Sequence, residues 1–138
     1  MALEKVLFVC IHNSARSQLA EALLRKLAGD RFEVSSAGLE PGKLNPYVVE
    51  ILREEGIDIK GKRPQAVSDL LKAKRSFDYV ITVCDESSAE RCPVFPGTAK
   101  RLHWSFNDPS KFTGSKEEIL QQVREVKEKM KAGLLCFI

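Results

Sequence analysis

Blocks of apolar residues alternate along the chain between the spacing of strands and the spacing of helices. The segment 5–10 is a nearly continuous apolar run, which is typical of a strand buried on both faces of a sheet. Over 17–27 the apolar residues recur at helical intervals, and Gly29 follows where a helix often ends on a glycine. The segment 32–37 predicts a second strand, which Gly38 closes.

The rest of the chain continues this alternation. Asn45 and Pro46 predict the start of a helix, because an asparagine cap followed by a proline suits a first turn, and this helix should run to position 55. The later predicted elements are a helix over 68–74, strands over 77–83 and 100–104, and an amphipathic helix over 115–131. Strands that alternate with helices predict an α/β fold: one domain over residues 1–138, with a four-stranded parallel sheet and helices on both faces.

Composition and charge narrow the class of protein. The chain has 138 residues, with 22 Lys and Arg against 19 Asp and Glu. Its net charge of +3 is too small to indicate nucleic-acid binding, which would need a concentrated basic patch. Its apolar runs are far shorter than the roughly 20 residues of a membrane span, and its first residues lack the order of a signal peptide. We therefore expect a cytoplasmic globular protein with no nucleic-acid or membrane partner.

The four cysteines are too few and too scattered for a disulfide framework. They are Cys10, Cys84, Cys92 and Cys136, and no two have the C-x-x-C spacing of a zinc site, so we expect no cofactor. Cys10 and Cys84 each end an apolar strand, and ligands bind beyond the carboxyl ends of the strands in parallel sheets. These two thiols are candidates for chemistry, whereas Cys136 lies in an apolar tail that should dock on the core or fray.

The segment from Cys10 to Ser17 reads C-x5-R-S and joins the first strand to the first helix. A short loop that wraps onto a helix N-terminus directs several backbone N–H groups into one concavity, which suits a tetrahedral oxyanion. Arg16 adds a planar fork for two oxygens of the anion. The same positive surroundings favour the thiolate of Cys10, to which Ser17 can donate a hydrogen bond. The residues expected to bind the oxyanion are Ile11, His12, Asn13, Ser14, Ala15 and Arg16.

This pattern predicts a nucleophile held under a bound oxyanion. It is not a Walker loop, because G-x-x-x-x-G-K-[S/T] is absent. The plainer interpretation is a buried cysteine at a strand end with an unrelated arginine nearby. The predicted strand before the motif and the predicted helix after it favour the functional interpretation.

The loop and much of the remaining chain resemble the low-molecular-weight protein tyrosine phosphatase family, and within it the thioredoxin-coupled arsenate reductases. The segment 9–18 is similar to the active-site loop of that family. Further matching segments are 20–22, 35–38, 45–46, 57–59, 92–93 and 103–109. The resemblance covers nearly the whole chain and implies the phosphatase-like α/β fold.

The resemblance also implies roles for residues outside the loop. The N-D-P turn at Asp108 is by itself an ordinary turn signal, but Asp108 matches the general acid of this family. From the residues alone, a redox role for Cys84 and Cys92 is no better supported than the plainer interpretation, in which Cys84 is a buried thiol and Cys92 a loop residue. The resemblance places them with Cys10 in a three-cysteine relay. Cys10 attacks arsenate, a Cys10–Cys84 disulfide forms as arsenite is released, and thioredoxin reduces a final Cys84–Cys92 disulfide.

Some members of the family bind potassium beside the loop. Asn13, Glu21 and Ser36 match that site. Gln65 stands where an aspartate ligand is expected, which counts against a potassium site in this chain. The spacing between the second and third cysteines of the relay is also one residue longer than the family pattern.

Two other functions stay open on the sequence. A tyrosine phosphatase that forms a phosphocysteine needs Cys10, Arg16, Ser17 and Asp108, but neither of the other two relay cysteines. Such phosphatases surround the cleft mouth with aromatic residues, whereas 110–112 reads Ser-Lys-Phe. This difference favours a small inorganic anion as the substrate. Weak phosphatase activity is expected in either case. The third possibility is a non-enzymatic redox switch or anion-binding module. The family is commonly monomeric, and a glutaredoxin–mycothiol system is the alternative reductant.

Overall fold

A four-stranded parallel sheet forms the centre of the molecule, with the strands in the order β2-β1-β3-β4. The structure is a computed structural model that describes residues 3–83 and 97–138. Its strands are β1 (Glu4–Cys10), β2 (Phe32–Gly38), β3 (Tyr79–Thr82) and β4 (Lys100–His103). Its helices are α1 (Arg16–Ala28), α2 (Pro46–Glu54), α3 (Val67–Lys72), the short 3-10 helix η2 (Pro109–Lys111) and α4 (Lys116–Phe137).

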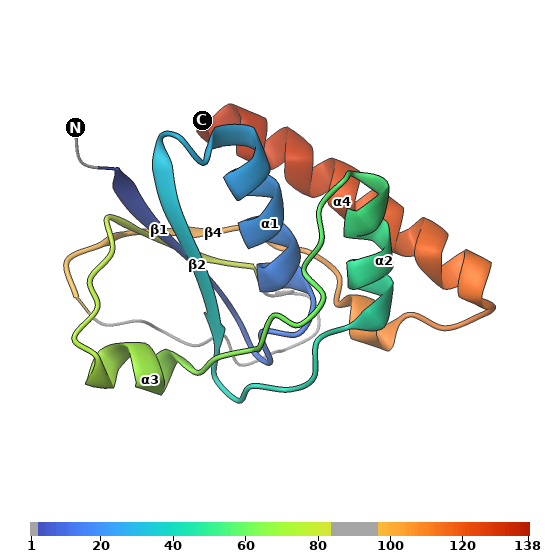
Figure 1. Cartoon of the computed structure of the whole chain (residues 1–138), viewed down its shortest axis with the longest axis horizontal. Coiled ribbons are helices and arrows are strands. Elements are labelled where there is room, and N and C mark those ends of the chain that lie inside the picture. The colour runs from blue at the N-terminus through green and yellow to red at the C-terminus, as the bar shows by residue number, and fades with distance from the viewer. Residues whose placement is uncertain (1–2, 84–96) are drawn as a thin grey trace.

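Helices cover both faces of the sheet because β1, at its centre, is apolar on both sides. Val6 and Phe8 pack in a core shared with α1, α2 and α4. Leu7 and Val9 pack on the opposite face, with residues of α3. Figure 1 shows this division, with α1, α2 and α4 gathered together and α3 apart from them. The predicted fold class is confirmed.

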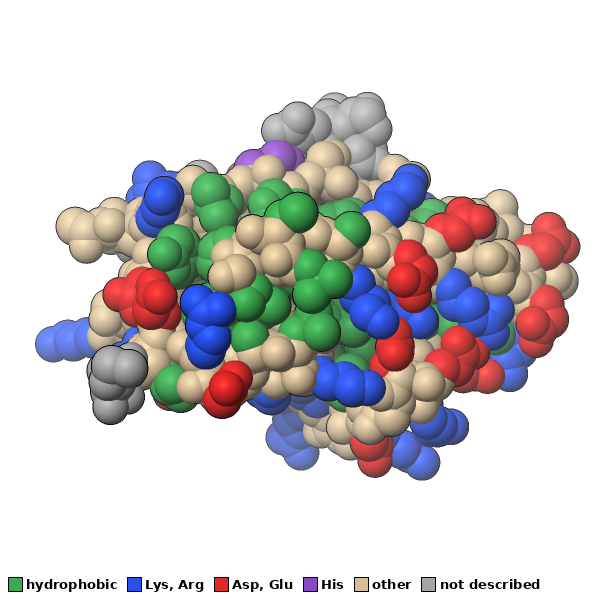
Figure 2. Space-filling model, turned by 90° about the horizontal axis from the view of Figure 1, so that it is seen from above, with side chains coloured by type: hydrophobic (Ala, Val, Ile, Leu, Met, Phe, Trp, Pro, Cys, Tyr) green, Lys and Arg blue, Asp and Glu red, His purple; other side chains and the backbone are tan. Residues whose placement is uncertain are grey.

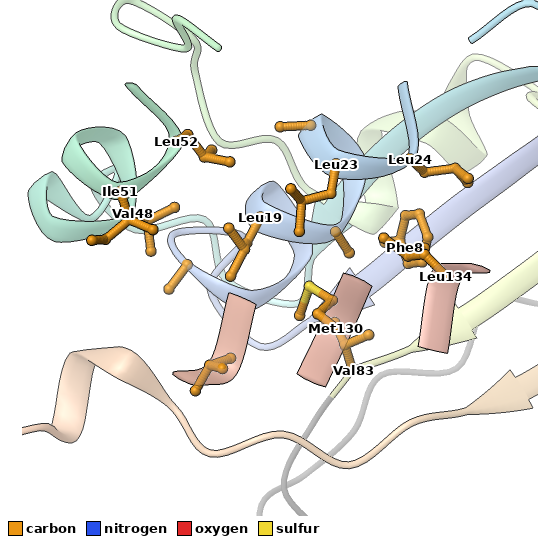
Figure 3. Close-up of a cluster of buried hydrophobic side chains, with 14 of the residues drawn as sticks. Phe8, Leu19, Leu23, Leu24, Val48, Ile51, Leu52, Val83, Met130 and Leu134 are labelled. Carbon is orange, nitrogen blue, oxygen red and sulfur yellow. The ribbon is translucent and has the colours of Figure 1, made fainter. Parts of the chain in front are cut away.

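The larger core lies where three helices meet the sheet. Figure 3 shows side chains from α1, α2 and α4 converging there, with Phe8 of β1 and Val83, which follows β3. The labelled side chains are all buried: Phe8, Leu19, Leu23, Leu24, Val48, Ile51, Leu52, Val83, Met130 and Leu134. Close packing of this kind fixes the positions of β1 and α1, and therefore of both ends of the loop between them.

The last helix is longer than the sequence pattern predicts. The pattern ends the helix at position 131, whereas α4 continues to Phe137. The ring of Phe137 lies 5.2 Å from that of Tyr79 and 5.9 Å from that of Trp104, between centroids, and these contacts hold the last turns. The apolar tail docks on the core as expected, through Leu134 and Phe137, whereas Cys136 within it is exposed.

The remaining strands and α-helices begin and end close to their predicted positions, whereas the short η2 was not predicted. Gly29 follows α1 as expected, but its φ of −64° is right-handed, so it is not the left-handed cap that the pattern suggested. The lack of room for a side chain explains the glycine at this position instead. A Cβ at this position would lie 2.4 Å from the carbonyl oxygen of Arg25.

One face of the molecule carries both signs of charge intermixed. Figure 2 shows Lys and Arg side chains among Asp and Glu side chains over the end where α2 and the first turns of α4 lie. This face therefore has no extended surface of a single sign. Within residues 3–83 and 97–138, no helix has both the length and the apolar character needed to cross a membrane.

Candidate active site

Cys10 ends β1 at the carboxyl edge of the sheet and is only 2% exposed. Its Sγ lies 2.8 Å from Ser17 Oγ, in the first turn of α1. The backbone N–H of Asn13 donates to the same sulfur at 3.2 Å. Hydrogen bonds donated to sulfur favour the thiolate, which is the nucleophilic form of cysteine.

The loop turns its carbonyl groups away from Cys10. The carbonyl oxygens of Ile11, His12 and Ser14 accept backbone hydrogen bonds of 2.8–2.9 Å from segment 40–45. No described peptide bond is cis, so the N–H group next to each of these carbonyls points the opposite way, and the one at Asn13 reaches the Cys10 sulfur. The His12 ring contacts the Glu40 carbonyl at 3.0 Å, so the backbone, and not this side chain, is available to the anion.

Asn13 fixes the shape of the loop. Its φ of +52° lies in the left-handed region, which asparagine tolerates better than most residues. Its amide nitrogen donates to Ser17 Oγ at 2.7 Å and to Ser36 Oγ at 2.9 Å. Its Oδ1 accepts from the Gln65 N–H at 2.9 Å and from Gln18 Nε2 at 3.1 Å. This side chain is fully hydrogen-bonded, so the strained loop residue is held in one conformation.

Arg16 and Asp108 come together although they lie far apart in the sequence. Arg16 is 2% exposed, and its NH2 lies 3.5 Å from Asp108 Oδ2. Its NH1 donates to the Phe106 carbonyl at 3.2 Å. The other oxygen of Asp108 accepts from the Ser110 N–H at 2.9 Å and caps η2. The structure thus brings the predicted general acid to the end of the oxyanion loop.

Gly38, at the end of β2, leaves room for the loop. A Cβ at this position would lie 2.7 Å from the Asn13 nitrogen and 2.8 Å from the Ile11 carbonyl oxygen. Both are backbone atoms, so they can move only if the loop moves. Sequence reasoning gave this glycine only the role of closing a strand, and the close approach depends on which strands are neighbours.

The residues expected at a potassium site do meet, but groups of the protein already bond their oxygens. Glu21 is 2% exposed; its Oε1 accepts from Ser36 Oγ at 2.5 Å. Its Oε2 bonds the Lys62 ammonium and lies 2.8 Å from Arg25 NH2. Gln65 Nε2 donates to the Ser36 carbonyl at 2.7 Å. This donor set does not fit a potassium ion, because the oxygens that would bind it already accept hydrogen bonds.

Lys62 is a residue that the sequence reasoning missed. It follows a turn between α2 and α3 and carries no motif. Its partner Glu21 lies 41 positions away along the chain, so no local pattern points to the pair. Burial lowers the pKa of Lys62 to about 8, whereas the adjacent Glu21 carboxylate favours the charged form.

The other two relay cysteines, Cys84 and Cys92, lie outside the described residues. The chain is described up to Val83, whose N–H donates to the Val9 carbonyl at 2.9 Å. The residue before Cys84 therefore lies beside the residue before Cys10.

The fold and the loop together define a class of α/β proteins in which a cysteine at the end of the first strand meets an oxyanion-binding loop at a helix N-terminus. The family described as low molecular weight phosphotyrosine protein phosphatase matches residues 5–136. The chain belongs to this family.

The relatives carry a more specific name. An arsenate reductase of Bacillus licheniformis is 41% identical over 136 residues, which cover 95% of each chain. The crystal structure of an arsenate reductase from Archaeoglobus fulgidus has a TM-score of 0.71 at 34% identity, covering 94% of this chain and 98% of that one. A thioredoxin-dependent arsenate reductase of Corynebacterium glutamicum has a TM-score of 0.63 at 33% identity, covering 99% of this chain and 64% of that one. The resemblance seen in the sequence is confirmed.

Proposed function

We propose that this protein reduces arsenate to arsenite with Cys10 as the nucleophile. The setting of Cys10 carries the proposal: its sulfur is buried, contacts Ser17 Oγ and accepts the Asn13 N–H at the mouth of the loop. Relatives named arsenate reductase, 41% and 40% identical over most of both chains, support arsenate as the substrate.

In the first proposed step the Cys10 thiolate attacks arsenic and forms an As–S bond while one As–O bond breaks. The leaving hydroxyl group of arsenate takes a proton from Asp108 and departs as water. Arg16 and the loop N–H groups hold the remaining oxygens. The 3.5 Å approach of Arg16 NH2 to Asp108 Oδ2 supports the placement of Asp108 beside the bound anion.

In the second proposed step the Cys84 thiolate attacks the Cys10 sulfur. A Cys10–Cys84 disulfide forms, and arsenite leaves with the electron pair of the As–S bond, so that arsenic(V) becomes arsenic(III) as two thiols are oxidised. Cys92 then attacks Cys84 and releases the Cys10 thiolate. The dithiol of thioredoxin reduces the resulting Cys84–Cys92 disulfide. The hydrogen bond from Val83 to Val9 supports the first of these exchanges.

A phosphatase is the second candidate, because the family includes phosphotyrosine phosphatases by description. The loop cysteine, its arginine and serine, and Asp108 would suffice for a phosphocysteine and its hydrolysis. Phosphate and arsenate share charge and shape, so weak phosphatase activity is expected beside arsenate reduction.

The setting of the enzyme is also part of the proposal. We infer thioredoxin as the reductant, because one structural relative is named as thioredoxin-dependent. A glutaredoxin–mycothiol system is the alternative. We further propose a single domain over residues 1–138 that acts as a monomer in the cytoplasm.

A single turnover without external reductant tests the function. Reduced protein is mixed with arsenate, arsenite is assayed, and disulfides are mapped by peptide mass spectrometry. We expect one arsenite per protein and a Cys84–Cys92 disulfide. No arsenite, with all four thiols intact, would overturn the proposal, and hydrolysis of an aryl phosphate would then be the next assay.

Two cysteine variants test the relay. Cys92→Ser should complete one turnover but not many with thioredoxin, because the exchange that frees Cys10 is lost. Cys136→Ser is the matched control, since Cys136 is exposed in the last turn of α4 and should leave turnover unchanged. Full multiple turnover of Cys92→Ser, with thioredoxin as the sole reductant, would contradict the relay.

A further inference from the structure

One carboxylate is buried beside the oxyanion loop without taking part in the proposed chemistry. The side chain of Glu21, on α1, is only 3% exposed. A buried carboxylate is costly unless it is paired and hydrogen-bonded. Two cations bond it: Lys62, with a side chain 27% exposed, and Arg25, which is 58% exposed. Lys62 is the more buried of the two and therefore the less screened by solvent.

We propose that the Lys62 ammonium is a built-in cation that positions the Cys10 thiol, so that the protein needs no alkali cation. This inference rests on the proposed role of Cys10 as the nucleophile. Lys62 is a positioning residue in this proposal, because it acts through a chain of hydrogen bonds and does not touch the reacting atoms.

The chain of hydrogen bonds has a fixed direction, which starts at the carboxylate. An ionised Glu21 can only accept, so the Ser36 hydroxyl donates to it and is left to accept from the Asn13 amide. The second hydrogen of that amide goes to Ser17 Oγ at 2.7 Å. The Ser17 hydroxyl hydrogen is therefore free to point at the Cys10 sulfur, 2.8 Å away.

Reversing the first of these bonds would disturb the rest. A neutral Glu21 could donate to Ser36, and the Ser36 hydroxyl hydrogen would then compete with the Asn13 amide. The cation on Glu21 thus helps to keep a hydrogen-bond donor on the Cys10 sulfur. Gln65 adds to this arrangement, because its backbone N–H and side chain bond oxygens of Asn13 and Ser36 that a metal ion would otherwise use.

A variant without the ammonium tests whether a dissolved cation can take its place. Lys62 lines a surface cavity of about 380 Å³ together with Ala22, Arg25 and Ile59, so the site can be reached from solution. In Lys62→Met the Glu21 carboxylate loses its nearest ammonium. A potassium or sodium ion can then approach the carboxylate through this cavity, although Arg25 still bonds Glu21.

The test measures alkylation of Cys10 by iodoacetamide, followed on the Cys10 peptide by mass spectrometry, and thermal unfolding. Both are measured in equal concentrations of KCl and NaCl, so that screening is the same. We expect Lys62→Met to slow alkylation about tenfold, which is typical when a residue that orients the groups in direct contact with a site is removed. Raising either salt should restore part of the rate, with KCl and NaCl alike, because Gln65 still bonds the oxygens that would select potassium. Wild type should not distinguish the two salts.

Two further variants keep the test decisive. Lys62→Arg should preserve the alkylation rate, and Lys60→Met, at an exposed lysine of the same turn, should behave as wild type. In a Glu21→Gln background the change Lys62→Met should have no further effect, because the carboxylate on which it acts is gone.

An unchanged alkylation rate in Lys62→Met, or a wild-type protein that prefers KCl, would overturn the inference. If Lys62→Met does not fold, a loss of alkylation in folded Lys62→Arg as large as that in Glu21→Gln would overturn it as well. Neither alkylation nor unfolding requires arsenate. A wild-type protein that releases no arsenite would therefore refute the proposed function alone. In the arsenate assay the loss should fall on kcat with KM nearly constant, since Lys62 does not touch the anion.

Discussion

Two groups of charged residues in this molecule differ in burial, and they have different tasks. Beside the oxyanion loop, Arg16 and Glu21 are each 2% exposed and bonded to partners from distant segments. Between α2 and α4, the Arg124 guanidinium bonds Glu54, and both side chains are about a third exposed. Solvent screens the second group, and such pairs contribute at most about 1 kcal/mol each.

The charged groups specify the local structure at the loop, but they do not specify it between α2 and α4. At the loop, removing one partner leaves a buried charge or donor unsatisfied, so the arrangement tolerates few substitutions. Between α2 and α4 the contact is specified by apolar side chains, and the charges lie at its rim. Activity and stability measured on the same variants separate these two regions.

The largest expected effect on activity comes from Arg16→Lys. Lysine keeps the positive charge but loses the fork that grips two oxygens of an anion. We expect single-turnover formation of arsenite to fall by about 10²- to 10³-fold, as it does when one oxyanion donor is removed. Arg53→Lys, at an exposed position of α2, makes the same change on the surface and should leave the rate as it is. Equal rates for both variants would show that the fork is not used.

The largest expected effect on stability comes from the core between α4 and the sheet. Met130 is fully buried, and Figure 3 shows its side chain between α4 and its neighbours. Met130→Ala should lower the free energy of unfolding by about 2–5 kcal/mol through lost burial and a cavity. Urea unfolding measures this loss, and alkylation of Cys10 in the folded variant should be unchanged. Lys129→Ala, on the exposed side of the same helix, is the control.

The fold could be predicted from the sequence because its elements follow local patterns. A nearly continuous apolar run marked β1, and apolar residues at helical spacing marked α1 and most of α4. The sequence pattern did not predict the final turns of α4, because Phe137 is held in the helix by contacts with residues distant in sequence. These are Phe32, Tyr79 and Trp104. Contacts of this kind leave no local pattern.

The candidate site divides in the same way. Cys10, Arg16 and Ser17 lie within one short segment, so their spacing alone indicated the loop. Asp108 became a candidate only through the family resemblance, because an N-D-P turn has no specific chemistry of its own. Lys62 had neither signal, because its contact with Glu21 depends on how the turn before α3 packs on α1.

A smaller effect should follow from adding one methyl group beside the loop. In Gly38→Ala the new Cβ would meet two backbone groups of the loop at under 3 Å, so the loop must shift. We expect a stability loss of about 1–3 kcal/mol, typical of overpacking, with slower alkylation of Cys10. Gly133→Ala is the matched control, since nothing lies within 4 Å of a Cβ there and alanine favours the helix. A loss of stability without slower alkylation would mean that the strain stays in β2.

The smallest effect should come from the second group of charges. Glu55 lies just after α2 and contacts two lysines of α4, at 2.7 Å to Lys131 and 3.3 Å to Lys127. The hydrogen bond from Lys131 is the main reason that the pKa of Glu55 is lowered from its usual value of 4.5. A carboxylate with a lowered pKa in the folded state stabilises the fold above its unfolded pKa. That contribution is lost as the pH falls through the folded pKa.

Glu55→Gln should therefore cost about 0.5 kcal/mol at pH 7, as partly exposed pairs do, and the difference from wild type should vanish well below pH 4.5. Chemical unfolding at pH 7 and at pH 3 measures both values. Glu125→Gln, an exposed glutamate on α4, removes the same charge without these contacts and should change stability less. A loss at pH 7 as large as that of Met130→Ala would erase the contrast between the two regions, because surface charge would then specify the α2–α4 contact.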